Sequence, residues 1–199
     1  RGIPTDWNWE RHIAHYTADN MWEWKFESIL ELSSNRVIDA CVYEAKPGLY
    51  KMWYKDEVNN SYTYSAISRD LYNWEVQEAE ITDVAHEGAN VFEFGGKIWM
   101  ITDFWNGLGV YSSDDFKNWK RKDSILDKPG KRQWDDEIGH HADVVVSGDN
   151  AYIFYFVHPK KVIEHPNRGL RACVQVARIT TDGDKLYCNR DEEFVLKLI

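Results

Sequence analysis

A seven-residue motif recurs along this chain and constrains its fold more than any other feature. The motif reads Ser-x-Asp-x-x-Asn-Trp over residues 68–74 and again over residues 113–119, which places its two tryptophans 45 residues apart. A degraded copy with one extra residue ends at Trp24, 50 residues before Trp74. A repeat of about 40–50 residues is typical of β-propellers, in which each blade is a four-stranded sheet.

The segments around these copies have the composition of strands. They are short and rich in aromatic and β-branched residues, and turn signals such as Lys46-Pro47-Gly48 and Gly95-Gly96 separate them. No stretch has a helical period beyond a turn or two. We therefore predict an all-β chain with strands at 37–43, 49–55, 61–68, 74–81, 89–94, 97–103, 109–113, 119–125, 141–146, 151–157, 171–179 and 185–188.

Composition limits the classes of partner. Aromatic residues are abundant, with 10 Trp, 11 Tyr and 8 Phe among 199 residues, and the net charge is −9. An acidic chain without a basic stripe argues against nucleic acid, and no apolar run approaches the roughly 20 residues of a membrane span. The three cysteines imply no disulfide framework. No signal peptide is visible near Arg1, so localisation stays open between cytoplasmic and secreted.

Three polar residues occupy matching places in the repeat. Asp39, Glu87 and His141 each stand ten residues before the start of a predicted second strand. The first strand of a propeller blade lines the central channel, so we expect these side chains to converge at one end of it. A slip of one residue would turn any of them to the opposite face.

Several segments, in this order and spacing, resemble glycoside hydrolase family 43 and its five-bladed propeller relatives. The resemblance runs from about Arg11 to Leu198, and its motifs are Ile38–Tyr43, His86–Phe92, the Ser-x-Asp-x-x-Asn-Trp copies and Gly139–Val145. It implies an inverting glycosidase that carries three acidic residues on successive blades. Arabinosides, xylosides and galactosides are the substrate class that it suggests.

The resemblance also implies roles for individual residues. Glu87, in Glu87-Gly88-Ala89, matches the general acid, although Ala89 replaces the proline of the family pattern. Asp39 matches the aspartate that orients this acid. The general base is an aspartate one blade farther upstream, about 50 residues before Asp39, which lies before Arg1. Asp6 is a poor substitute because it is out of phase with the repeat.

Inverting hydrolysis explains why carboxyl groups would occupy these positions. One protonated carboxyl donates to the leaving oxygen, and a carboxylate about 6.5–9.5 Å away activates water on the opposite face of the sugar. We expect apolar and carboxylate neighbours to favour the neutral form of Glu87.

Other residues are candidates for substrate contact. Trp105, in the loop 103–107, could form a platform for a sugar ring or belong to the core. His141 could contact substrate, coordinate a metal or form a hydrogen bond within the core. We also assign Asp103 and Asp143 to the substrate-binding set.

Other conspicuous side chains have structural explanations. Trp74 and Trp119 are expected to pack within blades, and Asp70 and Asp115 to cap turns. The run 135–137 reads as a solvated loop, although it could line the mouth of the channel.

The sequence predicts no cofactor. A structural calcium in the channel is conceivable, but no calcium-loop motif is visible, and the histidines and cysteines lack the spacing of zinc ligands. A non-catalytic carbohydrate-binding propeller, a phosphorylase or transferase on the same fold, and a structural interaction propeller stay open as alternatives. The oligomeric state stays open too.

The length has a different meaning when it is counted in blades. We treat residues 1–199 as a single catalytic propeller domain that holds three full blades and the trailing half of another, from about Arg11 to Leu32. A closed five-bladed ring needs more chain at about 45–50 residues per blade. We therefore expect about three and a half blades, an absent general base and an exposed sheet edge.

Overall fold

The computed structural model describes residues 7–160 and 171–198, and this part of the chain contains strands and no helix. It accordingly holds no helix that could cross a membrane. The contacts divide the chain into two compact units, Arg1–Ala85 and His86–Ile199, each described here by itself. The expectation of a single domain stays a prediction.

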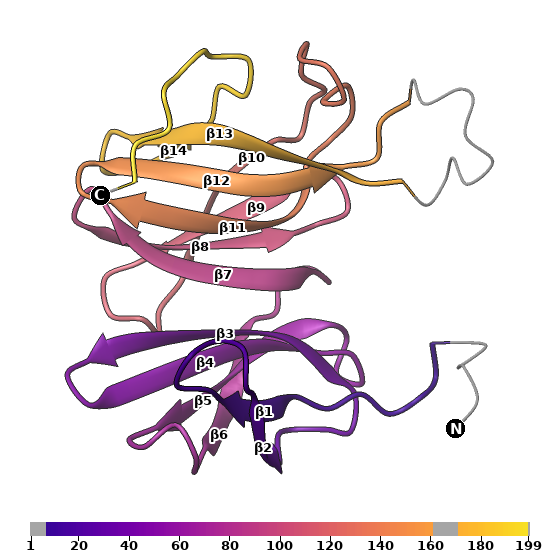
Figure 1. The fold of residues 1–199 in the computed structure, drawn as a ribbon, viewed down its shortest axis with the longest axis vertical. Coiled ribbons are helices and arrows are strands. Elements are labelled where there is room, and N and C mark those ends of the chain that lie inside the picture. The colour runs from indigo at the N-terminus through magenta and orange to yellow at the C-terminus, as the bar shows by residue number, and fades with distance from the viewer. Residues whose placement is uncertain (1–6, 161–170, 199) are drawn as a thin grey trace. The chain divides into compact units, whose positions relative to one another are not determined.

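The first unit holds one small sheet and one complete blade (Figure 1). Strands β1 (Ala14–Thr17) and β2 (Lys25–Ile29) pair antiparallel. The blade follows in chain order as a four-stranded antiparallel sheet of β3 (Val37–Lys46), β4 (Leu49–Asp56), β5 (Tyr62–Ser68) and β6 (Glu75–Ile81).

The second unit holds two further blades (Figure 1). The first consists of β7 (Glu87–Phe94), β8 (Lys97–Asp103), β9 (Leu108–Ser113) and β10 (Lys120–Ile125). The second consists of β11 (His140–Ser147), β12 (Asn150–Val157), β13 (Cys173–Thr181) and β14 (Leu186–Tyr187). The prediction of four-stranded blades, about three and a half in this chain, is confirmed.

The repeated motif forms the turn between the third and fourth strands of a blade. The Oδ1 atom of Asp70 accepts hydrogen bonds from the backbone N–H groups of Tyr72 at 2.9 Å and Asn73 at 2.8 Å. Leu71, between Asp70 and Tyr72, has a left-handed backbone with φ of 65°. Asp115 forms the same turn in the next blade, with a φ of 60° at Phe116. These aspartates cap turns, as the sequence predicted.

The degraded upstream copy needs no extra residue, which corrects our alignment of it. Asn20 takes the place of the aspartate and accepts the N–H groups of Trp22 at 3.0 Å and Glu23 at 2.9 Å. β1 and β2 flank this turn as β5 and β6 flank the turn at Asp70, so they correspond to the third and fourth strands of a blade. A related turn at Asp182 joins β13 to β14.

The blades differ in what they bury. In β3–β6, the carboxylate of Glu80 binds Lys51 and accepts hydrogen bonds from Trp53 Nε1 and Ser65 Oγ, both at 2.8 Å. The register places Trp99, Ile101 and Val110 of β7–β10 where β3–β6 has Lys51, Trp53 and Ser65. These three side chains belong to the apolar core of the second unit, together with Ile153 and Tyr155.

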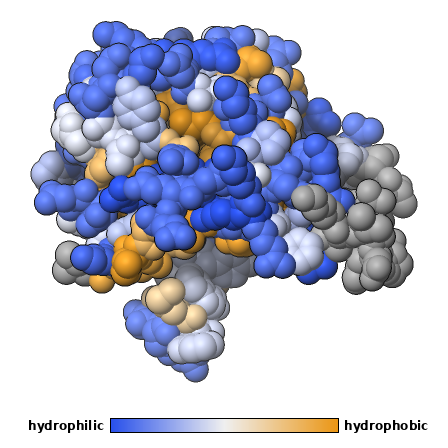
Figure 2. All heavy atoms as spheres, turned by 90° about the horizontal axis from the view of Figure 1, so that it is seen from above, coloured by the Kyte–Doolittle hydropathy of each residue, from blue (hydrophilic) through white to orange (hydrophobic). Residues whose placement is uncertain are grey.

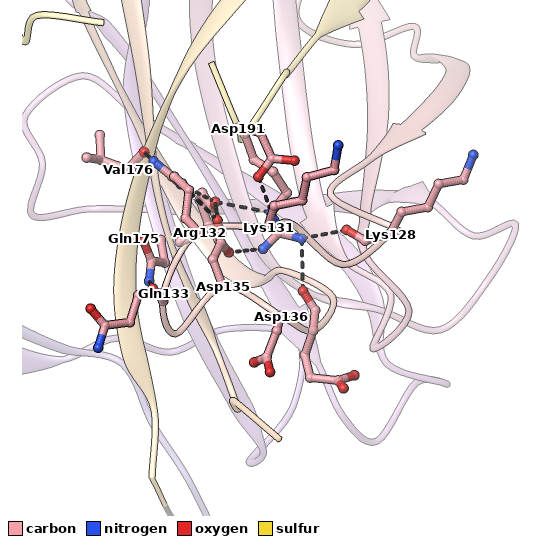
Figure 3. A network of polar contacts seen from close by, with 12 residues as sticks. Lys128, Lys131, Arg132, Gln133, Asp135, Asp136, Gln175, Val176 and Asp191 are labelled. Atoms are coloured by element: carbon pink, nitrogen blue, oxygen red, sulfur yellow. Dashed lines mark hydrogen bonds and ion pairs between the residues drawn. The ribbon is translucent and has the colours of Figure 1, made fainter. Parts of the chain in front are cut away.

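A buried ion cluster fixes the connection between β10 and β11 (Figure 3). Asp135 is fully buried, and its carboxylate binds Arg190 and accepts hydrogen bonds from Arg132 Nη2 at 2.9 Å and Tyr155 Oη at 2.8 Å. Arg190 also donates to the carbonyl oxygens of Lys128 and Glu137. Burial, above all, raises the pKa of the Tyr155 phenol. Asp135 is thus no solvated loop residue, contrary to our expectation for the run 135–137.

The small β1–β2 sheet exposes much of its apolar surface. Tyr16, Phe26 and Ile29 of the two strands are each about half exposed, Met21 and Trp22 in the turn between them are more so, and β1 pairs only with β2 among the described residues. Figure 2 shows hydrophilic side chains over most of one face of the molecule, with apolar side chains between them. The expected exposed sheet edge is therefore present in the first unit.

Candidate active site

Glu87 is the first residue of β7 and lies beside a β-bulge. It pairs with Asp103, the last residue of β8, and the register then shifts before Asn90 pairs with Ile101. The bulge contains Gly88, whose φ is 62°, a conformation that glycine adopts without strain. Glu87 is partly exposed and therefore accessible to a ligand.

The same bulge occurs at the start of the first strand in the other blades. In β3, Ile38 pairs with Lys55 before the shift, and in β11, His140 pairs with Phe156 before it. Ile38 and His140 are therefore the residues in register with Glu87. Asp39 and His141 each follow by one position, so the predicted common phase of Asp39, Glu87 and His141 is wrong by one residue.

The one-residue error has identifiable causes. β3 carries a second bulge between Glu44 and Lys46, which adds a residue to the spacing that we counted. β12 begins at Asn150 rather than at Ala151, so the residue ten positions before the second strand of the last blade is His140 and not His141. A bulge inserts one residue without any composition signal of its own, so a count of residues between strands does not detect it.

Asp39 occupies the bulge position of the first unit. Its φ is 59°, close to that of Gly88, and its side chain is partly exposed. A non-glycine residue in this conformation is uncommon and is typical of turns and functional sites. Asp39 and Glu87 belong to different units, so the pairing of the two carboxyl groups stays a prediction.

Asp103 lies in the interior at the centre of the second unit's site. Only 1% of its surface is exposed. Its Oδ1 accepts the N–H of Trp105 at 2.7 Å, and its Oδ2 accepts the N–H of His141 at 2.8 Å and lies 3.3 Å from His140 Nδ1. The carboxylate is thereby directed at the protein, and its predicted contact with substrate stays a prediction.

Trp105 is presented by a tight loop between β8 and β9. It is 45% exposed and has a φ of 55°. Phe104 N–H donates to the carbonyl oxygen of Gly107 at 3.1 Å, which closes the loop. A Cβ atom at Gly107 would lie 2.4 Å from the Cα of Asp127, so only glycine fits there. The exposure of Trp105 is compatible with the predicted sugar platform.

His141 brings β11 against the start of β7. A Cβ atom at Gly88 would lie 2.7 Å from Cδ2 and Nε2 of the His141 ring, so the imidazole sits directly against the residue that follows Glu87. β11 also packs against β7 and β8 (Figure 1). The structure therefore brings together Glu87, Asp103 and His141 at one end of the second unit's strands.

Asp143 lies farther along β11 and binds a residue of β7. Asn90 Nδ2 donates to its carboxylate, and Asn90 Oδ1 accepts the backbone N–H of Val144 at 3.1 Å. Asp143 is exposed, but the contact with Asn90 already joins the two blades. Its predicted contact with substrate stays a prediction.

Sequence reasoning missed His140 and Asn90. The His140 ring stacks on Phe156 with centroids 5.3 Å apart and lies 5.5 Å from the ring of His158. The pair His140-His141 was visible in the sequence, but the residue count favoured the second histidine. Asn90 lies in a predicted strand and in the motif His86–Phe92, but neither signal distinguished it from its neighbours.

The part of the chain that the structure describes holds no cluster of three or more His, Cys, Asp or Glu side chains with the arrangement of a metal site. Chemically, the second unit's site offers one accessible carboxyl group, an exposed indole and imidazole rings, with a buried carboxylate behind them. Such a set can donate a proton, pack against a sugar ring and bind hydroxyl groups.

Comparisons with known proteins identify the fold. No family model and no curated protein matches this chain. Among solved structures, an exo-1,5-α-L-arabinanase from a bovine ruminal metagenomic library is similar, with a TM-score of 0.64 and 16% identity over 85% of this chain and 65% of that one. A thermostable family-43 glycoside hydrolase has a TM-score of 0.61 and 15% identity over 94% of this chain and 74% of that one.

A fructofuranosidase from Schwanniomyces occidentalis, complexed with fructose, has a TM-score of 0.72 and 12% identity over 93% of this chain and 40% of that one. The chain thus spans less than two thirds of the arabinanase and of the fructofuranosidase. These proteins share the five-bladed β-propeller fold, which is accordingly the fold of this chain, present in part.

Proposed function

We propose that this chain is part of a glycoside hydrolase that acts on O-glycosidic bonds, with Glu87 as the general acid. The observation that carries the proposal is the position of Glu87: an accessible carboxyl group at the start of a blade's first strand, in register with the buried Asp103 and next to the glycine under His141. The arabinanase, the family-43 hydrolase and the fructofuranosidase of the same fold all act on glycosides, by their names.

The chemistry assigned to Glu87 is a single proton transfer. The protonated carboxyl donates to the glycosidic oxygen as the bond to the anomeric carbon breaks, and water adds to that carbon from the opposite face. A second carboxylate must accept a proton from this water, and we assign none of the described residues to that role. Asp39 is proposed to orient Glu87, and Trp105 to support the apolar face of a sugar ring. Arabinosides, xylosides and galactosides are the proposed substrates.

Replacement of Glu87 tests the assignment. In the intact protein, Glu87→Gln should lower hydrolysis of an arabinan or xylan oligosaccharide by roughly 10²- to 10⁴-fold, the usual contribution of a general acid. Glu93→Gln, an exposed substitution on the same strand, is the matched control and should keep wild-type activity. Undiminished hydrolysis in the Glu87 variant would refute the role.

A carbohydrate-binding propeller without catalysis is the second candidate. It is favoured by the register of Asp39, which occupies the bulge position and not the position that corresponds to Glu87. Saturable binding of the oligosaccharide by the intact wild-type protein, with no release of reducing ends, would establish this function in place of hydrolysis.

A further inference from the structure

Asp103 links three segments of the second unit. The residue ends β8, and its carboxylate accepts one hydrogen bond from the β8–β9 loop, at Trp105 N–H, and another from β11, at His141 N–H. It also faces the His140 ring at 3.3 Å and is the register partner of Glu87.

The backbone of Trp105 depends on this carboxylate. A φ of 55° is unfavourable for a large side chain, so surrounding contacts must hold it. The hydrogen bond of 2.7 Å from Trp105 N–H to Asp103 is one such contact, and the bond between Phe104 and Gly107 is another. Without the former, the indole would lose its fixed direction.

The position of His141 depends on the same group. Its backbone N–H lies within the β-bulge of β11, where it is not part of the paired ladder between His140 and Ala142. Asp103 accepts this N–H at 2.8 Å, and the imidazole then rests on Gly88. Asp103 therefore helps to fix, together with the Asn90 contacts, how β11 meets the strand that begins with Glu87.

We propose that Asp103, in place of the contact with the sugar that the sequence predicts, is a positioning residue that fixes Trp105 and His141 for substrate binding. The inference rests on the proposed function for its substrate. A carboxylate suits the role because both of its oxygens accept and neither donates. An asparagine of the same shape would turn an NH₂ group toward the N–H of either Trp105 or His141 and would lose that hydrogen bond.

The test compares Asp103→Asn with Asp56→Asn in the intact protein. Asp56 is also a fully buried aspartate at the end of a second strand, but its carboxylate accepts from Ser33, Ser34 and the turn that follows β4. Asp103→Asn should raise KM about tenfold, as expected from the loss of one hydrogen bond to a charged group, and leave kcat within about threefold. It should also speed amide hydrogen exchange at Trp105 or at His141. Asp56→Asn should change neither KM nor the exchange of these amides.

Trp105→Ala provides a second variant if Asp103→Asn folds poorly. It should reproduce the rise in KM and leave the His141 amide protected. Unchanged KM and unchanged exchange in Asp103→Asn would overturn the proposal, and so would a large loss of kcat at constant KM, because that result indicates a part in the chemistry. If the wild type hydrolyses no glycoside, the proposed function fails, whereas the exchange measurement still tests the positioning role.

Discussion

The blades β3–β6 and β7–β10 share their strand order and their turn motif but differ at two sets of matched positions. Where β3–β6 buries Glu80 with Lys51, β7–β10 places Trp99 and Ile101 in an apolar core. Where β3–β6 pairs Ile38 with Lys55, β7–β10 pairs Glu87 with Asp103. The comparison teaches that the repeated turns specify the architecture, whereas the positions that do not repeat determine the core and the site.

The difference between the two cores can be tested by Glu80→Ala. The side chains of Lys51 and Glu80 are 10% and 8% exposed, so removal of the carboxylate leaves the buried ammonium without its ion partner. We expect a loss of about 3–5 kcal/mol in the free energy of unfolding, measured by urea denaturation.

Ser124→Ala is the matched control for this prediction, because Ser124 occupies the position of Glu80 in the other blade. It should cost less than about 1 kcal/mol. Equal losses in the two variants would show that the buried ions of β3–β6 contribute no more than an ordinary strand contact.

Substitutions in the turn that both blades share should change the free energy of unfolding less than Glu80→Ala does. The change should have the same sign in both blades. The backbone N–H of Asn118, followed by its side-chain amide and the N–H of Lys117, holds the pKa of Asp115 well below its usual range. The equivalent groups of Asn73 and Tyr72 lower the pKa of Asp70.

A pKa that is lower in the folded state stabilises the fold above the unfolded value of about 3.9, and this contribution is lost as the pH falls below it. Asp70→Asn and Asp115→Asn should therefore each lose less folding stability than the wild type as the pH falls below about 4. At neutral pH each should lower the stability modestly, because an amide oxygen forms the same turn, as at Asn20, but without the charge whose hydrogen bonds lower the pKa of Asp70 and Asp115. Thermal unfolding between pH 2 and pH 7 measures the effect. An acid sensitivity identical to that of wild type in both variants would contradict it.

The strands and turns could be predicted from the sequence because their signals are local. Asp70 and Asp115 cap their own turns, and Gly95-Gly96 joins β7 to β8 with left-handed backbones, so each signal and its consequence lie within a few residues. Every predicted strand is present, with bounds that differ by a few residues.

The site was less predictable because its contacts are distant in sequence. Asp135 looked like a loop residue, and its burial depends on Arg190, 55 residues away. The register of Asp39 and His141 depends on bulges that no residue type announces. Asp103 was found as a candidate, but its inward direction follows from its bond to His141, 38 residues away.

We propose that Glu87 gives β7–β10 an acid function that Ile38 cannot give β3–β6. The most direct test of this proposal is the dependence of the Glu87→Gln variant on the leaving group, measured as kcat/KM with aryl glycosides in the intact protein. A general acid is needed only where the departing oxygen must be protonated. We predict near wild-type cleavage of a dinitrophenyl glycoside and a loss of roughly 10²-fold or more for a leaving group as basic as a sugar alcohol. An equal loss for both leaving groups would contradict the assignment.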